Sequence, residues 1–184
     1  MQPIKSLLKL LLERNKLKYM LFFHARTGSS TLKKILNTHP KICLYGEPFH
    51  NNRFINRENF KRQNKIPKHI NTIDDLDIAL KELSYKYNGI KQGIHNTNNK
   101  FCDHLLLNRN IKIIFLQRTN LLQMVISSLI AQKIQKWGGE TKEWRKMVEQ
   151  QKCEPFDIDF IQKRIQGINK RIQKYKQLLK DNNI

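Results

Sequence analysis

The amino-acid sequence predicts an α/β fold, a three-layer sandwich with a central, mostly parallel sheet. Short apolar runs of strand length alternate with helical patterns along the chain, as in folds with right-handed crossovers between parallel strands. One predicted strand, at 111–118, contains a continuous apolar run, as in a parallel strand covered on both faces. With 184 residues, 39% of them hydrophobic, we expect a single domain spanning 1–184.

The first half of the chain opens with a basic amphipathic pattern at 4–15 that predicts a short helix. The apolar, aromatic run at 18–25 predicts a buried strand, followed by a tight loop and a helix that Pro40 closes. A short strand is expected at 41–47, where a proline ends it. The polar, basic stretch at 50–72 lacks periodicity and predicts a surface excursion.

The second half continues the alternation of helices and strands. We expect a helix at 73–87, a weak strand at 89–95 and a helix near 101–107. The strong strand at 111–118 follows, and then a helix at 121–136. The two halves together supply enough strands for one open sheet.

The last element has the most regular pattern of the chain and predicts a long helix. Its apolar residues recur at steps of three and four, with acids at its start and lysines near its end that complement the helix dipole. They are Ile158, Ile161, Ile165, Ile168, Ile172, Tyr175 and Leu179. A seam of barely three heptads favours a helix packed on its own domain, and a coiled-coil homodimer is the alternative.

The charge of the chain indicates an anionic partner. Lys and Arg number 35 against 15 Asp and Glu, a formal net charge of +20. Part of this excess fits a composition rich in Lys, Asn and Ile, and no zinc finger, RNP or KH motif accompanies it. We therefore expect no specific nucleic-acid partner, and a basic nucleic-acid-binding module remains the alternative.

Cysteine usage and hydropathy indicate a cytoplasmic protein without a transmembrane segment. The three cysteines, Cys43, Cys102 and Cys153, are odd in number and have no CxxC spacing, which argues against disulfides and a zinc site. The longest apolar run, at 121–131, is shorter than the ~20 residues of a membrane helix. We expect a reducing compartment and no metal.

Polar side chains follow three of the predicted strands at the points where the strands end. Arg26 and its loop follow the first strand, Glu47 ends the second and Arg118 ends the strong strand near the middle of the chain. Carboxyl ends of strands in an open α/β sheet form one ligand-binding edge, so these groups should converge. The loop combines a cation, a flexible glycine, hydroxyls and a helix N-terminus, which suits an anion; its residues are Arg26, Thr27, Gly28, Ser29, Ser30 and Thr31.

These segments resemble the cofactor-binding motifs of sulfotransferases that use PAPS (3′-phosphoadenosine 5′-phosphosulfate). FFHARTGSSTLKKILNTHPKICLYGEPF is similar to the segment that binds the 5′-phosphosulfate, and LQRTNLLQMVISSLIAQ to the segment that binds the 3′-phosphate. In the second segment the matching residues are Arg118 and Ser127, with Ser128 as an alternative to the latter. The resemblance is to the bacterial trehalose and nodulation-factor carbohydrate sulfotransferases and continues through KWGGETKEW and PFDIDFIQKRI.

The resemblance implies a P-loop-like sulfotransferase fold that transfers a sulfuryl group from PAPS to a hydroxyl of a carbohydrate or glycolipid. It implies that Arg26 and the loop serve the leaving phosphate and that Glu47 is the general base. His95, at the end of the weak strand, is the alternative base. Relatives continue into another strand, so we expect a C-terminally shortened variant, with an inactive relic that binds the product PAP (3′-phosphoadenosine 5′-phosphate) as an alternative.

Three further residues are left with open roles. Lys91, on the same strand as His95, faces either the acceptor or solvent. Trp137 and Trp144 either form a sugar-stacking wall or pack in the core, and core packing is the default for tryptophan.

Overall fold

A computed structural model describes most of the chain. It covers residues 16–54, 69–135, 137, 146, 149–150 and 155–184. The predicted helix at 4–15, much of the excursion at 50–72, Trp144 and Cys153 lie outside the described residues. The expectations for those segments stay predictions.

Four parallel strands form the central sheet and confirm the α/β prediction. They are β1 (Tyr19–Phe23), β2 (Leu44–Gly46), β5 (Gly89–Gly93) and β6 (Lys112–Leu116), in the order β2-β5-β1-β6. Phe23 lies opposite Gly93 on one side and Leu116 on the other, so these strands end in register. Their carboxyl ends therefore meet along one edge, as the sequence predicted.

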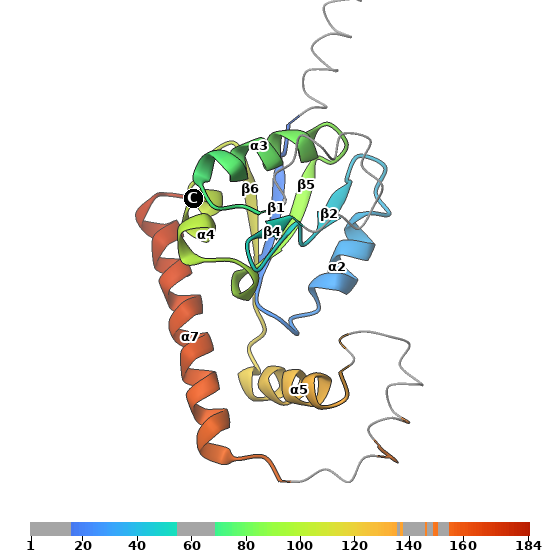
Figure 1. Ribbon diagram of the computed structural model, residues 1–184, viewed down its shortest axis with the longest axis vertical. Helices are drawn as coiled ribbons and strands as arrows, with labels where there is room; N and C mark the ends of the chain where they lie inside the picture. The colour runs from blue at the N-terminus through green and yellow to red at the C-terminus, as the bar shows by residue number, and fades with distance from the viewer. Residues whose placement is uncertain (1–15, 55–68, 136, 138–145, 147–148, 151–154) are drawn as a thin grey trace, which may run out of the picture.

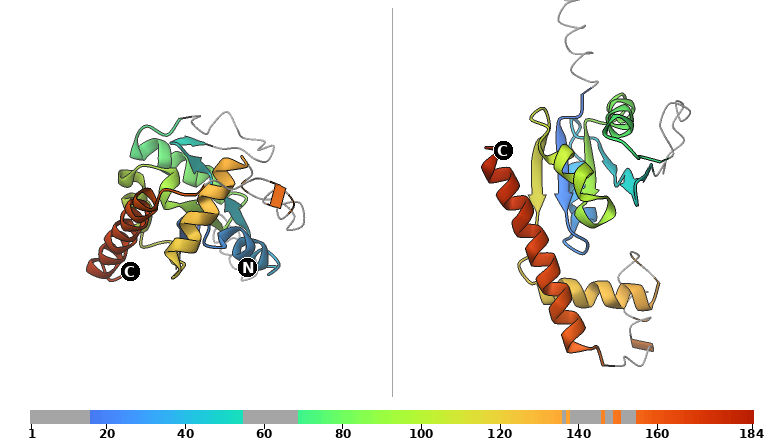
Figure 2. Two further views of the ribbon diagram at one scale, coloured as in Figure 1. Left: turned by 90° about the horizontal axis from the view of Figure 1, so that it is seen from below. Right: turned by 60° about the vertical axis from the view of Figure 1, so that its left-hand side comes forward.

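Helices flank this sheet, consistent with a three-layer sandwich. They are α2 (Ser29–Leu36), α3 (Ile73–Ser84), α4 (Asn99–Leu106), α5 (Leu121–Lys133) and α7 (Ile158–Asp181). Met20, Phe22 and Ile90 project from the sheet into a core shared with α3, α4 and Tyr175 of α7. Figures 1 and 2 show α7 running beside the sheet and α5 lying beyond the carboxyl ends of the strands. This places α5 over the candidate site.

β5, which has the weaker strand pattern in the sequence, is a central strand of the sheet. β6, which has the stronger pattern, lies at the edge. All five residues of β5 are buried, and β5 pairs with both β1 and β2. Among the described residues β6 pairs only with β1, and Lys112 and Ile114 on it are exposed. The prediction that the strong strand is covered on both faces is therefore wrong.

A small hairpin precedes the undescribed segment and was not predicted. It pairs β3 (Phe49–His50) with β4 (Arg53–Phe54) across two asparagines with left-handed backbones. The Gln92 side chain of β5 fixes it: Nε2 donates to Phe49 O at 2.8 Å, and Phe49 N donates to Oε1 at 3.3 Å. The chain on either side of Glu47 is thus fixed to β5.

The long helix α7 packs on its own domain, as the sequence favoured. Ile161, Ile172 and Tyr175 are buried, and Tyr175 meets Phe22 of β1 edge to face at 5.3 Å between ring centroids. Ile158, at the start of the predicted apolar stripe, is instead 69% exposed. None of the described helices combines the length and the apolar character needed to cross a membrane.

Candidate anion-binding and catalytic site

The loop after β1 turns sharply into α2. Arg26 has φ 66° and Gly28 has φ 84°, both in the left-handed region, which glycine adopts without strain and arginine rarely enters. The Thr27 hydroxyl donates to His24 O at 2.9 Å and ties the turn to the end of the strand. Gly28 caps α2 without a side-chain hydrogen bond, so the first N–H groups of the helix remain suited to an anion.

Two arginines and a serine meet beside this loop; we call Arg26, Arg118 and Ser127 the arginine cluster. Arg26 Nε donates to Ser127 Oγ at 2.8 Å, and Arg118 Nη1 donates to the backbone oxygen of Arg26 at 3.1 Å. Arg26 Nη1 also donates to Trp137 O at 3.0 Å, and Arg118 Nη2 to Gln123 Oε1 at 2.6 Å. The structure thus brings Arg26 and Arg118 together, as expected of residues at the ends of parallel strands, and places Ser127 of α5 beside them.

The electrostatics of the arginine cluster favour an anionic ligand. Burial and the neighbouring Arg118 both lower the pKa of Arg26, because two like charges in a partly desolvated site repel each other. The four hydrogen bonds above all end on neutral oxygens. A phosphate between the guanidinium groups would relieve the repulsion through charge-assisted hydrogen bonds.

A second group lies between β2 and β5; we call Glu47, Lys91 and Asn96 the carboxylate cluster. Lys91 Nζ lies 2.6 Å from Glu47 Oε1, and Asn96 Nδ2 donates to Glu47 Oε2 at 2.8 Å. Lys91 also donates to Ser30 Oγ at 3.0 Å and to Ser29 Oγ at 3.4 Å. The ammonium group therefore connects the carboxylate directly to the anion loop.

Lys91 is buried, with 4% of its surface exposed, so the interpretation that it faces solvent is wrong. Its ammonium lies 4.7 Å from the centre of the Phe23 ring, within the range of a cation–π contact. A buried ammonium needs a counter-ion, and Glu47 supplies it. Glu47, which the resemblance marks as the general base, therefore has Lys91 as an ion-pair partner.

The backbone at Glu47 is held in an unusual conformation. Its φ is 48°, which a non-glycine residue adopts at an energetic cost, and its N–H donates to Lys91 O at 2.6 Å. The Lys33 ammonium of α2 lies close by, because a Cβ built on Gly46 would be 3.1 Å from its Nζ. Strain of this kind persists where surrounding contacts hold the residue in place, and the contacts of Glu47 with Lys91 and Asn96 do so here.

His95 lies in the short 3-10 turn η2 (Ile94–Asn96) that follows β5. Its ring stacks on that of His24 at 5.2 Å between centroids while the side chain keeps an exposed edge. Desolvation and the neighbouring His24 lower the pKa of His95 to about 4, although Glu47 opposes this. His95 is therefore neutral near pH 7 and close to Glu47, so it stays the alternative base.

Trp137 does not pack in the core, which corrects the default expectation for it. The residue is 54% exposed, and its carbonyl oxygen accepts the hydrogen bond from Arg26. An exposed indole at the rim of the arginine cluster is compatible with the stacking role. Trp144 lies outside the described residues.

Sequence reasoning missed three contributors to the site: Asn96, Gln123 and Lys33. Asn96 directly follows the predicted base His95, and Gln123 lies in the first turn of the helix after Arg118. Position alone could have suggested them, since helices and turns that follow strand ends line the same edge. No spacing or periodicity in the sequence distinguishes them from other polar residues.

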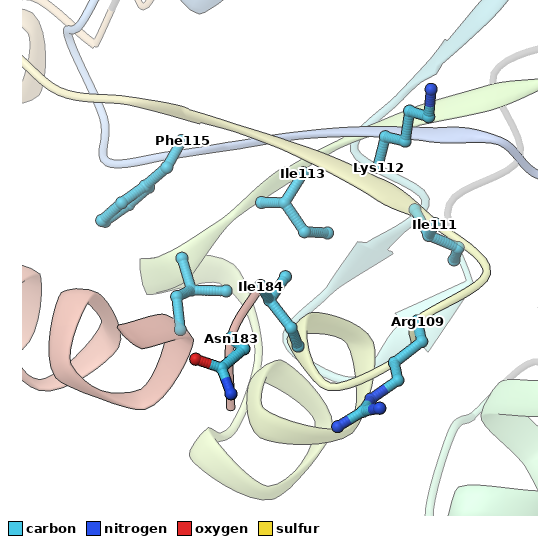
Figure 3. A pocket seen from close by; sticks show the side chains of 8 residues that line it. Arg109, Ile111, Lys112, Ile113, Phe115, Asn183 and Ile184 are labelled. Carbon is cyan, nitrogen blue, oxygen red and sulfur yellow. The ribbon is translucent and has the colours of Figure 1, made fainter. Parts of the chain in front are cut away.

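The cavity drawn in Figure 3 is separate from this site. It has a volume of about 500 Å³ and lies beside β6 and the end of α7. Its lining residues are Arg109, Ile111, Lys112, Ile113, Phe115, Leu179, Asn183 and Ile184. No group of three or more His, Cys, Asp or Glu side chains suited to a metal occurs in the described part of the chain.

A scan against protein-family models and searches of curated proteins and of solved structures give no match to this chain. The function is therefore inferred from the geometry of the arginine and carboxylate clusters.

Proposed function

We propose that the protein is a PAPS-dependent sulfotransferase with a P-loop-like fold. The observation that carries the proposal is the arginine cluster: two arginines lie together at the carboxyl edge of the sheet, where Arg26 donates to Ser127 and Arg118 donates to the backbone oxygen of Arg26. Such a site suits a ligand with more than one phosphate. The anion loop and a carboxylate lie along the same edge, as transfer from a bound phosphosulfate requires.

The residues present fit the two phosphates of PAPS. Arg26 and the first N–H groups of α2 would hold the 5′-phosphosulfate, and Arg118 with Ser127 would hold the 3′-phosphate. Ser127 Oγ accepts a hydrogen bond from Arg26, so its own hydroxyl hydrogen remains to be donated. One short hydrogen-bonded chain would thereby join the two ends of the cofactor.

The chemistry follows from the charges. The acceptor oxygen forms a bond to sulfur while the bond between sulfur and the 5′-phosphate oxygen breaks, and negative charge grows on the departing phosphate. Arg26, the loop N–H groups and the Lys91 ammonium would stabilise that charge, as in phosphoryl transfer. Glu47 would take the proton of the acceptor hydroxyl.

We place the acceptor among carbohydrates or glycolipids and the protein in the cytoplasm. The exposed Trp137 beside Arg26 supports a sugar acceptor, because indole faces stack well on sugar rings. The acceptor hydroxyl would have to reach Glu47 from the open side of the carboxyl edge.

Calorimetric titration with PAP at physiological salt tests this proposal. We expect the wild-type protein to bind PAP and Arg26→Ala and Arg118→Ala each to weaken binding about 10- to 100-fold, the loss for one charged hydrogen-bonding group. Arg109→Ala, an exposed arginine beside the separate cavity, should bind as the wild type does. No binding by the wild type, or equal binding by all three variants, would refute the cofactor assignment.

Salt dependence separates this proposal from the nucleic-acid alternative. PAP bound by two fixed phosphate sites should respond weakly to salt. A protein that binds a phosphate backbone along its basic surface loses affinity steeply, by a slope set by the released counterions. Steep salt dependence of DNA or RNA binding together with no PAP binding would favour the basic binding module.

A further inference from the structure

Asn96 is the least exposed polar residue of the turn that follows β5. It is 2% exposed, and its backbone oxygen accepts a hydrogen bond from Asn51 N at 2.7 Å. Its side-chain amide points at Glu47, with Nδ2 at 2.8 Å from Oε2. A buried amide that meets one carboxylate oxygen fixes the orientation of the carboxylate.

Gly93 makes room for this contact. A Cβ at Gly93 would lie 2.9 Å from His95 Cε1 and 3.0 Å from Asn96 Nδ2, closer than side chains ordinarily approach. Any larger residue would displace the side chains of His95 and Asn96. The close approach at Gly93 therefore allows the Asn96 amide to reach Glu47.

The two oxygens of Glu47 have different partners. Oε1 accepts from the Lys91 ammonium at 2.6 Å, and Oε2 from the neutral Asn96 amide at 2.8 Å. We propose that Asn96 is a positioning residue that holds the Glu47 carboxylate, through Oε2, in the orientation needed for the proton transfer of the reaction.

The Asn96 amide can serve both protonation states of that oxygen. Its Oδ1 is buried and has no hydrogen-bond partner among the described residues. Rotating the Asn96 amide by about 180° would exchange the positions of Oδ1 and Nδ2. The number of hydrogen bonds would stay the same, because Oδ1 has no partner to lose. In that orientation Oδ1 would accept a hydrogen bond from a protonated Oε2, so Asn96 supports Glu47 before and after proton transfer.

The inference rests on the proposed function for its reaction step. The acceptor O–H proton moves to the Glu47 carboxylate as the new bond from oxygen to sulfur forms, and the electron pair of the broken bond between sulfur and oxygen leaves with the 5′-phosphate oxygen. Glu47 then releases the proton to solvent, which reaches 20% of its side chain. Among the described residues, the charged and titratable groups near Glu47 include Lys91 of β5, Lys33 of α2 and His95 of η2.

The substitution Asn96→Asp tests the inference most sharply, because it keeps the size of the side chain and places a second carboxyl against Oε2. Two carboxyl groups at this distance share one proton rather than both ionise. We expect the acid limb of the pH–rate profile to move up by about one unit or more, with the KM for PAPS unchanged within about twofold. Asn51→Asp is the matched control: it adds the same charge beside η2 without the contact to Glu47, and should leave the limb in place.

A second variant covers the case in which Asn96→Asp does not fold. Asn96→Leu removes the donor to Oε2 and should lower kcat about tenfold while PAPS KM stays constant, because Asn96 contacts no cofactor residue. An unchanged acid limb in Asn96→Asp, or an unchanged kcat in Asn96→Leu, would overturn the positioning role.

A readout without turnover separates this inference from the proposed function. In protein labelled with ¹³C at glutamate carboxyls, the Glu47 resonance should titrate at higher pH in Asn96→Asp than in the wild type. If the wild type fails to use PAPS but the titration moves, the contact between Asn96 and Glu47 stands and the proposed reaction falls. If the protein turns over PAPS but neither readout moves, the reaction stands and the role of Asn96 falls.

Discussion

The two clusters at the carboxyl edge of the sheet differ in how their charges are balanced. In the carboxylate cluster the buried Lys91 has its counter-ion, Glu47, within 2.6 Å. In the arginine cluster two guanidinium groups lie near each other, and Arg118 contributes to lowering the pKa of Arg26. The carboxylate cluster therefore pairs opposite charges, whereas the arginine cluster places like charges together, and an added anion would relieve their repulsion.

Under the proposed function, this difference suits the two clusters to different parts of the reaction. A site whose charges repel is suited to binding a polyanion, because the ligand relieves the repulsion. A carboxylate held by a strained backbone, a lysine and an amide is suited to a positioned proton transfer. Ser29 and Ser30 join the two, since both accept hydrogen bonds from Lys91 and lie in the anion loop.

The largest expected effect is a loss of turnover when the carboxylate cluster is changed, without a loss of cofactor binding. Glu47→Gln should lower turnover with PAPS by about 10²–10⁴, the contribution of a general base, while PAP affinity stays within about threefold. Steady-state kinetics and calorimetry on the same preparation measure both quantities. If turnover survives, His95 or water acts as the base, and the carboxylate cluster has a structural role only.

The next effect is on stability and concerns the carboxylate cluster alone. Lys91→Met should lower the free energy of unfolding by about 2–4 kcal/mol, because it removes the buried ammonium from its ion pair with the Glu47 carboxylate. The loss is smaller than for a fully buried pair, since 20% of the Glu47 side chain is exposed.

Urea denaturation measures this loss, and two further variants serve as its controls. Adding Glu47→Gln to Lys91→Met should restore part of the loss, because a neutral amide needs no counter-ion. Lys112→Met, on the exposed edge strand, should change stability by less than about 0.5 kcal/mol. Equal losses in Lys91→Met and Lys112→Met would show that the buried pair contributes nothing.

The smallest effect concerns His24, which follows the middle strand β1 and stacks on His95. Burial, together with the charge of Arg171, lowers the pKa of His24 to about 4, against about 6.5 in an unfolded chain. As the pH falls, the unfolded state therefore takes up the proton at a higher pH than the folded state does. The contribution of His24 to the free energy of unfolding is fully present above about pH 6.5 and is lost as the pH drops toward 4.

The variant His24→Gln tests this pH dependence. Between pH 7 and 4.5 it should lose less stability than the wild type, by on the order of 1–2 kcal/mol, because a neutral amide does not take up the proton. Thermal melts across that interval measure the difference. Parallel stability curves for the two proteins would contradict the assignment of acid sensitivity to His24.

The sequence predicts the parts of the site that lie at the ends of apolar runs. Arg26, Glu47 and Arg118 each follow a hydrophobic stretch, and the rule that parallel strands end at one edge brings them together. These three residues were predictable because local pattern and strand direction suffice to place them. Ser127, by contrast, was indicated only by the resemblance to the 3′-phosphate segment of sulfotransferases, with Ser128 as the alternative.

The rest depends on contacts between distant residues. Lys91 and Gln92 make β5 look like a weak strand, yet both are buried: Lys91 pairs with Glu47, and Gln92 holds the backbone of Phe49. The role of Asn96 depends on the close approach at Gly93, which no periodicity reveals. Hydrophobic pattern underestimates a central strand whose polar residues find their partners only in the folded chain.

The central claim, that two arginines hold the two phosphates of one cofactor, is tested most directly with a pair of ligands. PAP and adenosine 5′-monophosphate differ only in the 3′-phosphate. Calorimetry should show that Arg118→Ala weakens PAP binding about tenfold or more and leaves binding of the monophosphate within about twofold, whereas Arg26→Ala weakens both. Equal losses for both ligands in Arg118→Ala, or no loss for either, would contradict the claim.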